Sequence, residues 1–248
     1  MAALTPMMAQ YMEVKNQYKD CILFYRLGDF YEMFFDDALT ASRELEITLT
    51  GRDCGQEERA PMCGVPYHAC DIYLNKLIEK GYKVAICEQM EDPKLAKGIV
   101  KREVIRIVTP GTNMSQAILD ETRNNYLMCI FGCNDEYGVA VCDITTGEFR
   151  LCHISSTSKL YDEINKYSPT EIIGNGAFLS CDLNFDYMKE KMKITISEAP
   201  SHYFNDDTCE DFIKRQFKVG TIDGLGIDEQ EDMLLSAGAL LQYLHETQ

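Results

Sequence analysis

The feature that most constrains the fold is a cluster of turn residues near the middle of the chain, Thr109-Pro110-Gly111-Thr112-Asn113. Before this cluster, helical and extended hydrophobic patterns alternate, whereas after it three extended patterns follow one another directly. A chain of 248 residues, of which 46% are hydrophobic, is long enough to build two cores. The sequence therefore predicts two α/β domains over residues 1–113 and 124–248, joined by a linker at 114–123.

The first half begins with a helix signal, in which Thr5 is placed to cap a helix and Pro6 occupies its first turn. We expect this helix at 5–19 and a buried strand at 21–27. The pair Gly28-Asp29 is expected to end that strand and to cap a second helix running toward Leu45. Further elements are expected as strands at 47–50, 83–88 and 104–108, a polar loop at 51–60, and a helix from Pro66 that ends at Gly81.

The second half opens with three short apolar runs at 126–131, 138–144 and 148–153, separated by the turn pairs Asn134-Asp135 and Thr146-Gly147. This pattern predicts a three-stranded antiparallel meander. Helical and extended patterns alternate beyond it, with a helix at 159–167, strands at 170–173 and 193–197, and a final helix at 232–245. The order β-β-β-α-β-α-β-α is that of an RNase H-like mixed sheet.

The formal net charge of −16 argues against a free-standing DNA-binding protein. Lys and Arg side chains that neutralise phosphates supply most of the affinity that does not depend on sequence. The charge is unevenly distributed, however, because residues 1–113 carry 14 basic and 17 acidic side chains, against 10 and 23 in residues 114–248. The first half is nearly balanced, and the second half carries the acidity.

The eleven cysteines are odd in number, form no CxxC pair and lie mostly within apolar runs. This usage predicts reduced, buried thiols and a cytoplasmic protein. No run approaches the roughly 20 apolar residues that cross a bilayer, and no basic segment followed by an apolar stretch opens the chain. We therefore expect no membrane association.

The most informative segment for function is Arg26-Leu27-Gly28-Asp29-Phe30-Tyr31-Glu32-Met33-Phe34. Here a glycine turn places an aromatic residue and a carboxylate two positions apart, at the expected start of a helix, where aromatic side chains are free to project outward. The alternative is that the aromatic residues form one apolar face of an amphipathic helix.

Four motifs, in the same order along the chain, resemble the N-terminal domain of MutS-family DNA mismatch repair proteins. They are residues 26–38, Met62-Cys63-Gly64-Val65-Pro66-Tyr67-His68-Ala69, Ala85-Ile86-Cys87-Glu88-Gln89, and Arg106-Ile107-Val108-Thr109-Pro110-Gly111-Thr112. Residues 141–149 resemble the start of the connector domain of that family, and residues 237–248 resemble its last helix. The resemblance covers essentially the whole chain and implies a mismatch-recognition domain followed by an RNase H-like connector.

The resemblance also implies roles for two residues, since the Phe and Glu of a Phe-x-Glu motif enter the minor groove at a mismatch in that family. The corresponding residues are Phe30 and Glu32. An apolar wedge costs a few kcal/mol, roughly, of base unstacking, and the cost is smallest where pairing is already faulty. Glu32 is expected to accept a hydrogen bond from a base N–H exposed by mispairing or displacement, and to be repelled at a correct pair. The alternative is a protonated Glu32 that donates the hydrogen bond instead.

Basic residues of the first half are candidates for contacts to the DNA backbone. Arg52, in the polar loop, is a candidate phosphate ligand beside the mismatch. Lys94 and Lys97, with Lys101 and Arg102, form a second basic patch. The alternative for each of these side chains is an ordinary solvated position on the surface.

Two other residues suggest catalysis, and we assign neither of them to it. Asp143 lies in the first meander of an RNase H-like sheet, where metal-dependent nucleases keep a carboxylate, but Glu148, Asp162 and Asp186 qualify as partners only by type. His68 follows a proline that starts a helix and is expected to be structural. Fold alone does not confer activity, so no catalytic residue, metal site or cofactor site is assigned to this chain.

The resemblance implies further components outside the chain. The sequence holds no G-x-x-x-x-G-K-[ST] phosphate loop, so the ATP and Mg expected of a full-length family member are assigned to ATPase domains beyond residue 248. The expected partners are double-stranded DNA with mismatches or small loops, a second copy in a homodimer, and a MutL-type protein. The acidic second domain is expected to relay the state of the mismatch site to the ATPase domains.

Overall fold

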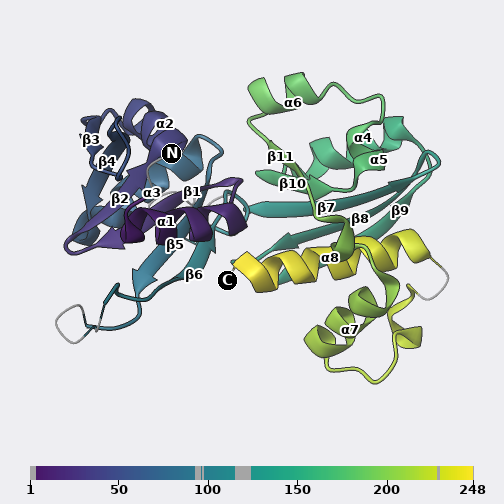
Figure 1. Ribbon diagram of the computed structural model, residues 1–248. Helices are drawn as coiled ribbons and strands as arrows, with labels where there is room; N and C mark the ends of the chain where they lie inside the picture. Colours follow the sequence, from purple (N-terminus) through teal and green to yellow (C-terminus); the bar gives the residue numbers. More distant parts are fainter. Residues whose placement is uncertain (1–3, 93–95, 97, 115–123, 228–229, 248) are drawn as a thin grey trace. The chain divides into compact units, whose positions relative to one another are not determined.

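The computed structural model describes residues 4–92, 96, 98–114, 124–227 and 230–247, and the chain divides into two compact units, residues 1–109 and 110–248 (Figure 1). The division lies four residues before the predicted end of the first domain. Residues 110–113 pack on the second unit. Of the predicted linker at 114–123, only Met114 is among the described residues.

The first unit contains a six-stranded mixed sheet with helices on both faces (Figure 1). The sheet order is β3-β4-β2-β1-β5-β6, and β1 pairs with β5 in parallel while the other neighbours are antiparallel. Its elements are α1(Pro6–Gln17), β1(Cys21–Leu27), β2(Phe30–Phe34), α2(Phe35–Leu45), β3(Thr50–Arg52), β4(Ala60–Pro66), η1(Tyr67–Ala69), α3(Cys70–Glu79), β5(Lys83–Gln89) and β6(Arg102–Val108).

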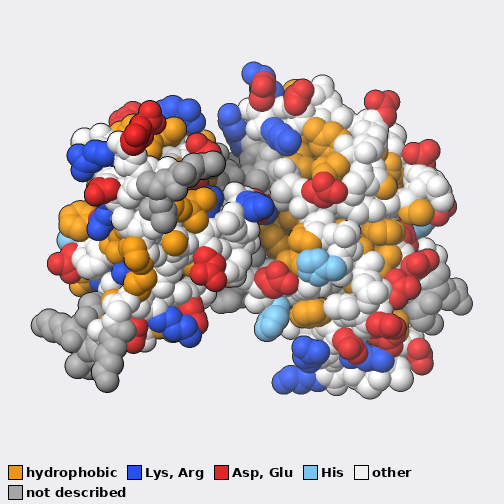
Figure 2. Space-filling model, viewed as in Figure 1, with side chains coloured by type: hydrophobic (Ala, Val, Ile, Leu, Met, Phe, Trp, Pro, Cys, Tyr) orange, Lys and Arg blue, Asp and Glu red, His pale blue; other side chains and the backbone are white. Residues whose placement is uncertain are grey.

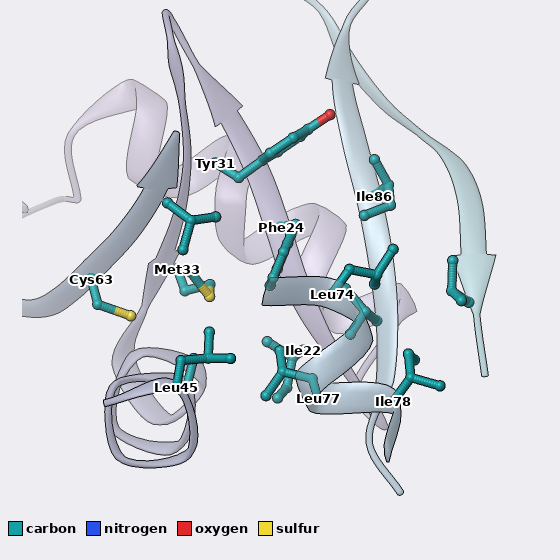
Figure 3. Close-up of a cluster of buried hydrophobic side chains, with 14 of the residues drawn as sticks. Ile22, Phe24, Tyr31, Met33, Leu45, Cys63, Leu74, Leu77, Ile78 and Ile86 are labelled. Carbon is teal, nitrogen blue, oxygen red and sulfur yellow. The ribbon is translucent and has the colours of Figure 1, made fainter. Parts of the chain in front are cut away.

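Successive side chains of a strand point to opposite faces of the sheet, so the apolar side chains of the first unit form two cores. One core lies between the sheet and helices α2 and α3, and contains Ile22, Phe24, Tyr31 and Met33 (Figure 3). The other lies beneath α1, where Tyr11 of the helix packs among Tyr25, Phe34 and their neighbours. The sheet is therefore covered on both faces, which explains why β1 is apolar at nearly every position.

The predicted helix following Gly28-Asp29 is wrong over its first five residues, because Phe30–Phe34 form strand β2. Gly28 adopts a positive φ of 59°, and with Asp29 it forms a two-residue hairpin turn between β1 and β2. Both edges of β2 are paired, to β1 and to β4. Helix α2 then begins at Phe35. The predicted strand at 47–50 is found at 50–52, and β4 was not predicted.

The second unit contains a five-stranded sheet in the order β11-β10-β7-β8-β9. Strand β8 is antiparallel to both β7 and β9, whereas β10 is parallel to both β7 and β11. This is the predicted RNase H-like arrangement. Its elements are β7(Tyr126–Cys133), β8(Glu136–Asp143), β9(Glu148–Ile154), α4(Thr157–Tyr167), β10(Glu171–Gly174), α5(Gly176–Leu179), α6(Phe185–Glu190), β11(Thr195–Glu198), η2(Ser201–Tyr203), α7(Asp206–Phe217), η3(Asp223–Leu225) and α8(Glu231–Thr247).

Helices cover both faces of the second sheet as well. Helices α7 and α8 pack over one face, against residues such as Leu127 and Cys129, while α4, α5 and α6 lie over the other (Figure 1). Helix α8 approaches β8 so closely that a Cβ at Gly138 would lie 1.9 Å from the backbone oxygen of Asp232. Helix α7, capped by Asn205, was not predicted from the sequence.

Residues 110–113 belong to the second unit because buried polar groups hold them there. The Gly111 N–H donates to Glu171 Oε2 at 2.9 Å, and Asn125 Nδ2 donates to the Pro110 carbonyl at 3.1 Å. The other oxygen of Glu171 accepts a hydrogen bond from the Tyr243 hydroxyl of α8 at 2.6 Å. Glu171 is fully buried, so these bonds replace the water that its carboxylate loses.

We expect Gly138→Ala to destabilise the second unit by about 3 kcal/mol, because the backbone of α8 must move to admit one methyl group. Amide hydrogen exchange of peptides from β8, measured by mass spectrometry, would rise accordingly. Gly220→Ala is the matched control, since a Cβ there meets no atom within 4 Å and exchange should stay unchanged. Equal exchange in both variants would contradict the close approach of α8 to β8.

The eleven cysteines are all free, and we expect them to differ widely in reactivity. Burial raises the pKa of the thiols of Cys63, Cys142 and Cys209 to about 12, whereas Cys133 is exposed at the end of strand β7. At pH 8 roughly one in ten thousand of each buried thiol is ionised, and the thiolate is the reactive species. Alkylation of the native chain followed by peptide mapping should modify Cys133 first. Early modification of Cys142 or Cys209 would contradict this packing.

Candidate nucleic-acid interface

Phe30 and Glu32 lie on the same face of a strand, which gives their two-residue spacing a physical meaning. Alternate residues of a strand share a face, whereas positions two apart on a helix point in very different directions. The Phe30 ring is 46% exposed at the first position of β2, and the side chain of Glu32 is 15% exposed. The strand therefore presents an aromatic ring and a carboxylate side by side.

Helix α1 covers only part of this face. Phe34, the next residue on the same face of β2, is buried against Tyr11 of α1, with ring centroids 4.9 Å apart. Toward the hairpin turn, β2 instead pairs Phe30 with Leu27 of β1 and with Pro66 of β4. Phe30 is thus the outermost residue of a face whose inner end is packed.

Arg26 fixes the hairpin turn that carries Phe30. Its Nε donates to the Gly28 carbonyl at 2.5 Å, and its guanidinium carbon lies 3.8 Å from the centre of the Tyr67 ring. The Tyr67 N–H in turn donates to the Asp29 carbonyl at 3.0 Å. Both residues of the turn are therefore bonded to groups outside it, so the position of Phe30 is set by more than the hairpin alone.

Glu88 of β5 extends this network into the core. Its Oε1 accepts the Tyr31 hydroxyl and forms an ion pair with Arg26 at 3.4 Å. Burial, together with the hydrogen bond to Glu88, raises the pKa of Tyr31 above its ordinary value, so the hydroxyl stays a donor. The strand that bears Phe30 and Glu32 is thereby tied on its other face to β5.

Arg52 lies beside Glu32, as its Nη1 donates to Glu32 Oε2 in an ion pair. Arg52 is on the edge strand β3, and β4 separates it from β2. The three predicted residues Phe30, Glu32 and Arg52 thus belong to neighbouring parts of one sheet. Arg52 is 38% exposed, so part of its guanidinium still faces solvent.

The predicted basic patch is only partly described. Lys94 and Lys97 lie outside the described residues, and their proposed backbone contact stays a prediction. Lys101 is exposed and pairs with Glu103 at 2.5 Å. Arg102 does not belong to a surface patch, because it is buried and donates to the Arg26 carbonyl at 2.8 Å and to Gln10 Oε1 at 3.0 Å. It supports the β1 strand end instead.

Asp143 and His68 take structural positions. Asp143 is fully buried at the end of β8, and its Oδ1 accepts hydrogen bonds from the backbone and hydroxyl of Thr145 at 2.9 and 2.7 Å. Glu148, one of its candidate partners, binds Tyr126 and Arg150. His68 lies in the short η1 turn beside the Tyr67 ring. Among the described residues, no group of three or more His, Cys, Asp or Glu side chains is arranged to hold a metal ion.

Several residues of this site were given no role by the sequence prediction. Arg26, Tyr67 and Glu88 lie within the motifs that carry the family resemblance, but their contacts join segments 41 to 62 positions apart. These contacts become visible only when the strands are placed side by side in the structure. The signal that could have pointed to them is the pair of charged residues, Arg26 and Glu88, which follow the apolar middles of two strands, since such residues pair when they are partly buried.

The surface around these groups is mixed in charge. Figure 2 shows acidic and basic side chains interspersed over the visible face of the first unit, in keeping with the near balance of its sequence. None of the helices in the described ranges is both long and apolar enough to span a bilayer.

Comparison with known proteins accounts for both units. The family model for MutS domain I matches residues 5–117, and the model for MutS domain II matches residues 125–248. Proteins named DNA mismatch repair protein MutS from Lachnoclostridium phytofermentans and Acetivibrio thermocellus are 59% and 56% identical over the whole chain, and one from Clostridium tetani is 48% identical over 99% of it. The chain spans 27% or 28% of the length of these relatives. The chain belongs to the MutS family and consists of its domains I and II.

Proposed function

We propose that the first unit recognises mispaired or unpaired bases in double-stranded DNA by inserting Phe30 into the minor groove, with Glu32 bonding to the displaced base. The observation that carries this proposal is the exposed Phe30 ring at the end of a fixed hairpin, with a carboxylate on the same face of the strand. The names of the relatives support the same substrate class.

The mechanism rests on a comparison of two costs. Separating stacked bases to admit a phenyl ring costs roughly a few kcal/mol, and a mispaired step has already lost part of its stacking and pairing. Because Arg26 and Tyr67 fix the backbone of the turn that carries Phe30, little backbone ordering is required on insertion. The site therefore selects deformable steps and needs no contact with a particular sequence.

Glu32 adds discrimination at the inserted step. An ionised carboxylate only accepts hydrogen bonds, so it is satisfied by a base N–H that mispairing has exposed. At a correctly paired step the base N–H groups are already engaged, and the carboxylate meets phosphate repulsion without compensation. Glu32 thus weakens binding to matched DNA more than binding to mismatched DNA.

The second unit acts as a connector, in this proposal, and not as a nuclease. Its acidity keeps it away from DNA, and Asp143 holds the turn that follows β8 by bonding to Thr145.

The connector relays the state of the mismatch site to ATPase domains of the whole protein, which bind ATP and Mg. The whole protein works as a cytoplasmic homodimer and recruits a MutL-type partner. Lys94 and Lys97 are its candidate contacts to the DNA backbone, whereas Arg52 forms an ion pair with Glu32.

The experiment that tests this function uses a chimera in which the chain replaces the matching part of the Lachnoclostridium phytofermentans relative. Affinities for a G·T-mismatched and a matched duplex are measured at fixed salt concentration, because ionic strength alters both. We expect Phe30→Ala to reduce the ratio of these affinities at least about tenfold, with weak binding to matched DNA retained.

The matched control is Ile72→Ala, which removes a more exposed apolar side chain from α3 of the same unit. It should leave the preference for mismatched DNA unchanged. An unaltered preference in Phe30→Ala would show that the ring does not act as the wedge. The 248-residue chain alone should bind either duplex weakly, since its net charge is −16. Tight binding by the chain alone would also count against the proposal.

A further inference from the structure

The ion pair between Arg52 and Glu32 spans three strands of the first sheet. Glu32 of β2 pairs with Gly64 of β4, and Arg52 of β3 pairs with Ala60 of the same strand. Gly64 and Ala60 are four positions apart on β4 and so share a face. Arg52 and Glu32 therefore project from one face of the sheet, with β4 between them.

Gly64 makes this approach feasible. A Cβ at position 64 would lie 3.5 Å from Glu32 Cγ and 3.2 Å from the Tyr31 carbonyl oxygen. A side chain there would press on the backbone of β2 and occupy space over β4 next to the Glu32 side chain. The glycine thus leaves the space beside β4 that the Glu32 side chain occupies when it pairs with Arg52.

The ion pair gives the two carboxylate oxygens of Glu32 different surroundings. Arg52 Nη1 donates to Oε2, while Oε1 receives no hydrogen bond from the residues that the structure describes. This single charge-assisted bond holds Oε2 in place and restricts the rotation of the Glu32 side chain. One oxygen is held and the other is left as an acceptor on the face that also bears Phe30.

The pair also changes the electrostatic cost of placing an acid near DNA. A lone carboxylate is repelled by phosphates on both strands, whereas a carboxylate paired with a guanidinium presents little net charge at a distance. The side chain of Glu32 is 15% exposed, so water screens its charge only weakly. Without Arg52, this repulsion and the rotation of the free side chain would both act against the bond to a base.

We propose that Arg52 is a positioning residue for mismatch discrimination, which orients Glu32 and offsets its charge, and that it acts through Glu32 and not as an independent phosphate anchor. This inference rests on the proposed function of Phe30 and Glu32. It differs from the sequence-based expectation for Arg52, in which a phosphate contact would strengthen binding to every duplex alike.

A double-mutant cycle in the same chimera distinguishes the two roles. We expect Arg52→Gln to lower the ratio of mismatched to matched affinity about tenfold, as a hydrogen bond to a charged group is lost or misdirected. In a Glu32→Ala background, the same substitution should change that ratio less than about twofold, because the carboxylate through which it acts is gone. Arg52→Lys, which keeps the charge but not the planar donor set, should fall between wild type and Arg52→Gln.

An independent phosphate contact gives a different result. Arg52→Gln would then weaken matched and mismatched binding by the same factor in both backgrounds, and the slope of log affinity against log salt would fall by about 0.9. That outcome would overturn the inference and leave the proposed function standing. Arg43→Gln is the charge-matched control, since Arg43 is exposed on α2 and pairs with Glu44. Retention of mismatch preference by Phe30→Ala would instead refute the proposed function itself.

Discussion

The arrangement of the proposed recognition site depends on the two-residue turn at Gly28–Asp29. A positive φ at Gly28 closes the β1–β2 hairpin with Leu27 opposite Phe30, and this register decides which side chains of β2 face the core. A shift by one residue would bury Phe30 and expose Tyr31. Because Tyr31 and Met33 lie in the core beneath α2 and α3, the hydrophobic packing and the turn require the same register. The turn and the hydrophobic packing thus each determine which side chains of β2 are exposed.

An exposed aromatic ring is useful as a wedge only if its strand resists displacement. Here the resistance comes from groups that serve the fold: Arg26 bonds to the turn, and Glu88 ties both Arg26 and Tyr31 to β5. Removing one member of such a network leaves a partly buried charge without its partner, which costs more than the pair contributes. The energy that holds Phe30, the proposed wedge, in place is therefore part of the stability of the first unit, so the insertion that we propose need not be preceded by ordering of a loop.

The sequence allowed the two-unit division, the meander and most strands to be predicted, because their hydrophobic runs are bounded by clear turns. It failed at residues 30–34, where Phe30, Tyr31 and Phe34 fit a helical face as well as a strand. The deciding interaction is pairing with β4, some thirty residues away in a segment to which the sequence prediction assigned no strand. Phe30 and Glu32 were identified through the family resemblance. The meeting of Arg52 with Glu32 requires the register of three strands, which no local pattern contains.

The second unit shows how a site in the first could be coupled to more distant parts of a longer protein. The segment entering this unit and its final helix both bond to one buried carboxylate, Glu171, through Gly111 and Tyr243. Displacing either group alone would leave part of a buried acceptor unsatisfied, at a cost of roughly 1–3 kcal/mol. Joint displacement of residues 110–113 and α8 is therefore favoured over displacement of either segment alone. In the proposed function, this coupling would help the second unit to move as one body, with Glu171 joining the two segments.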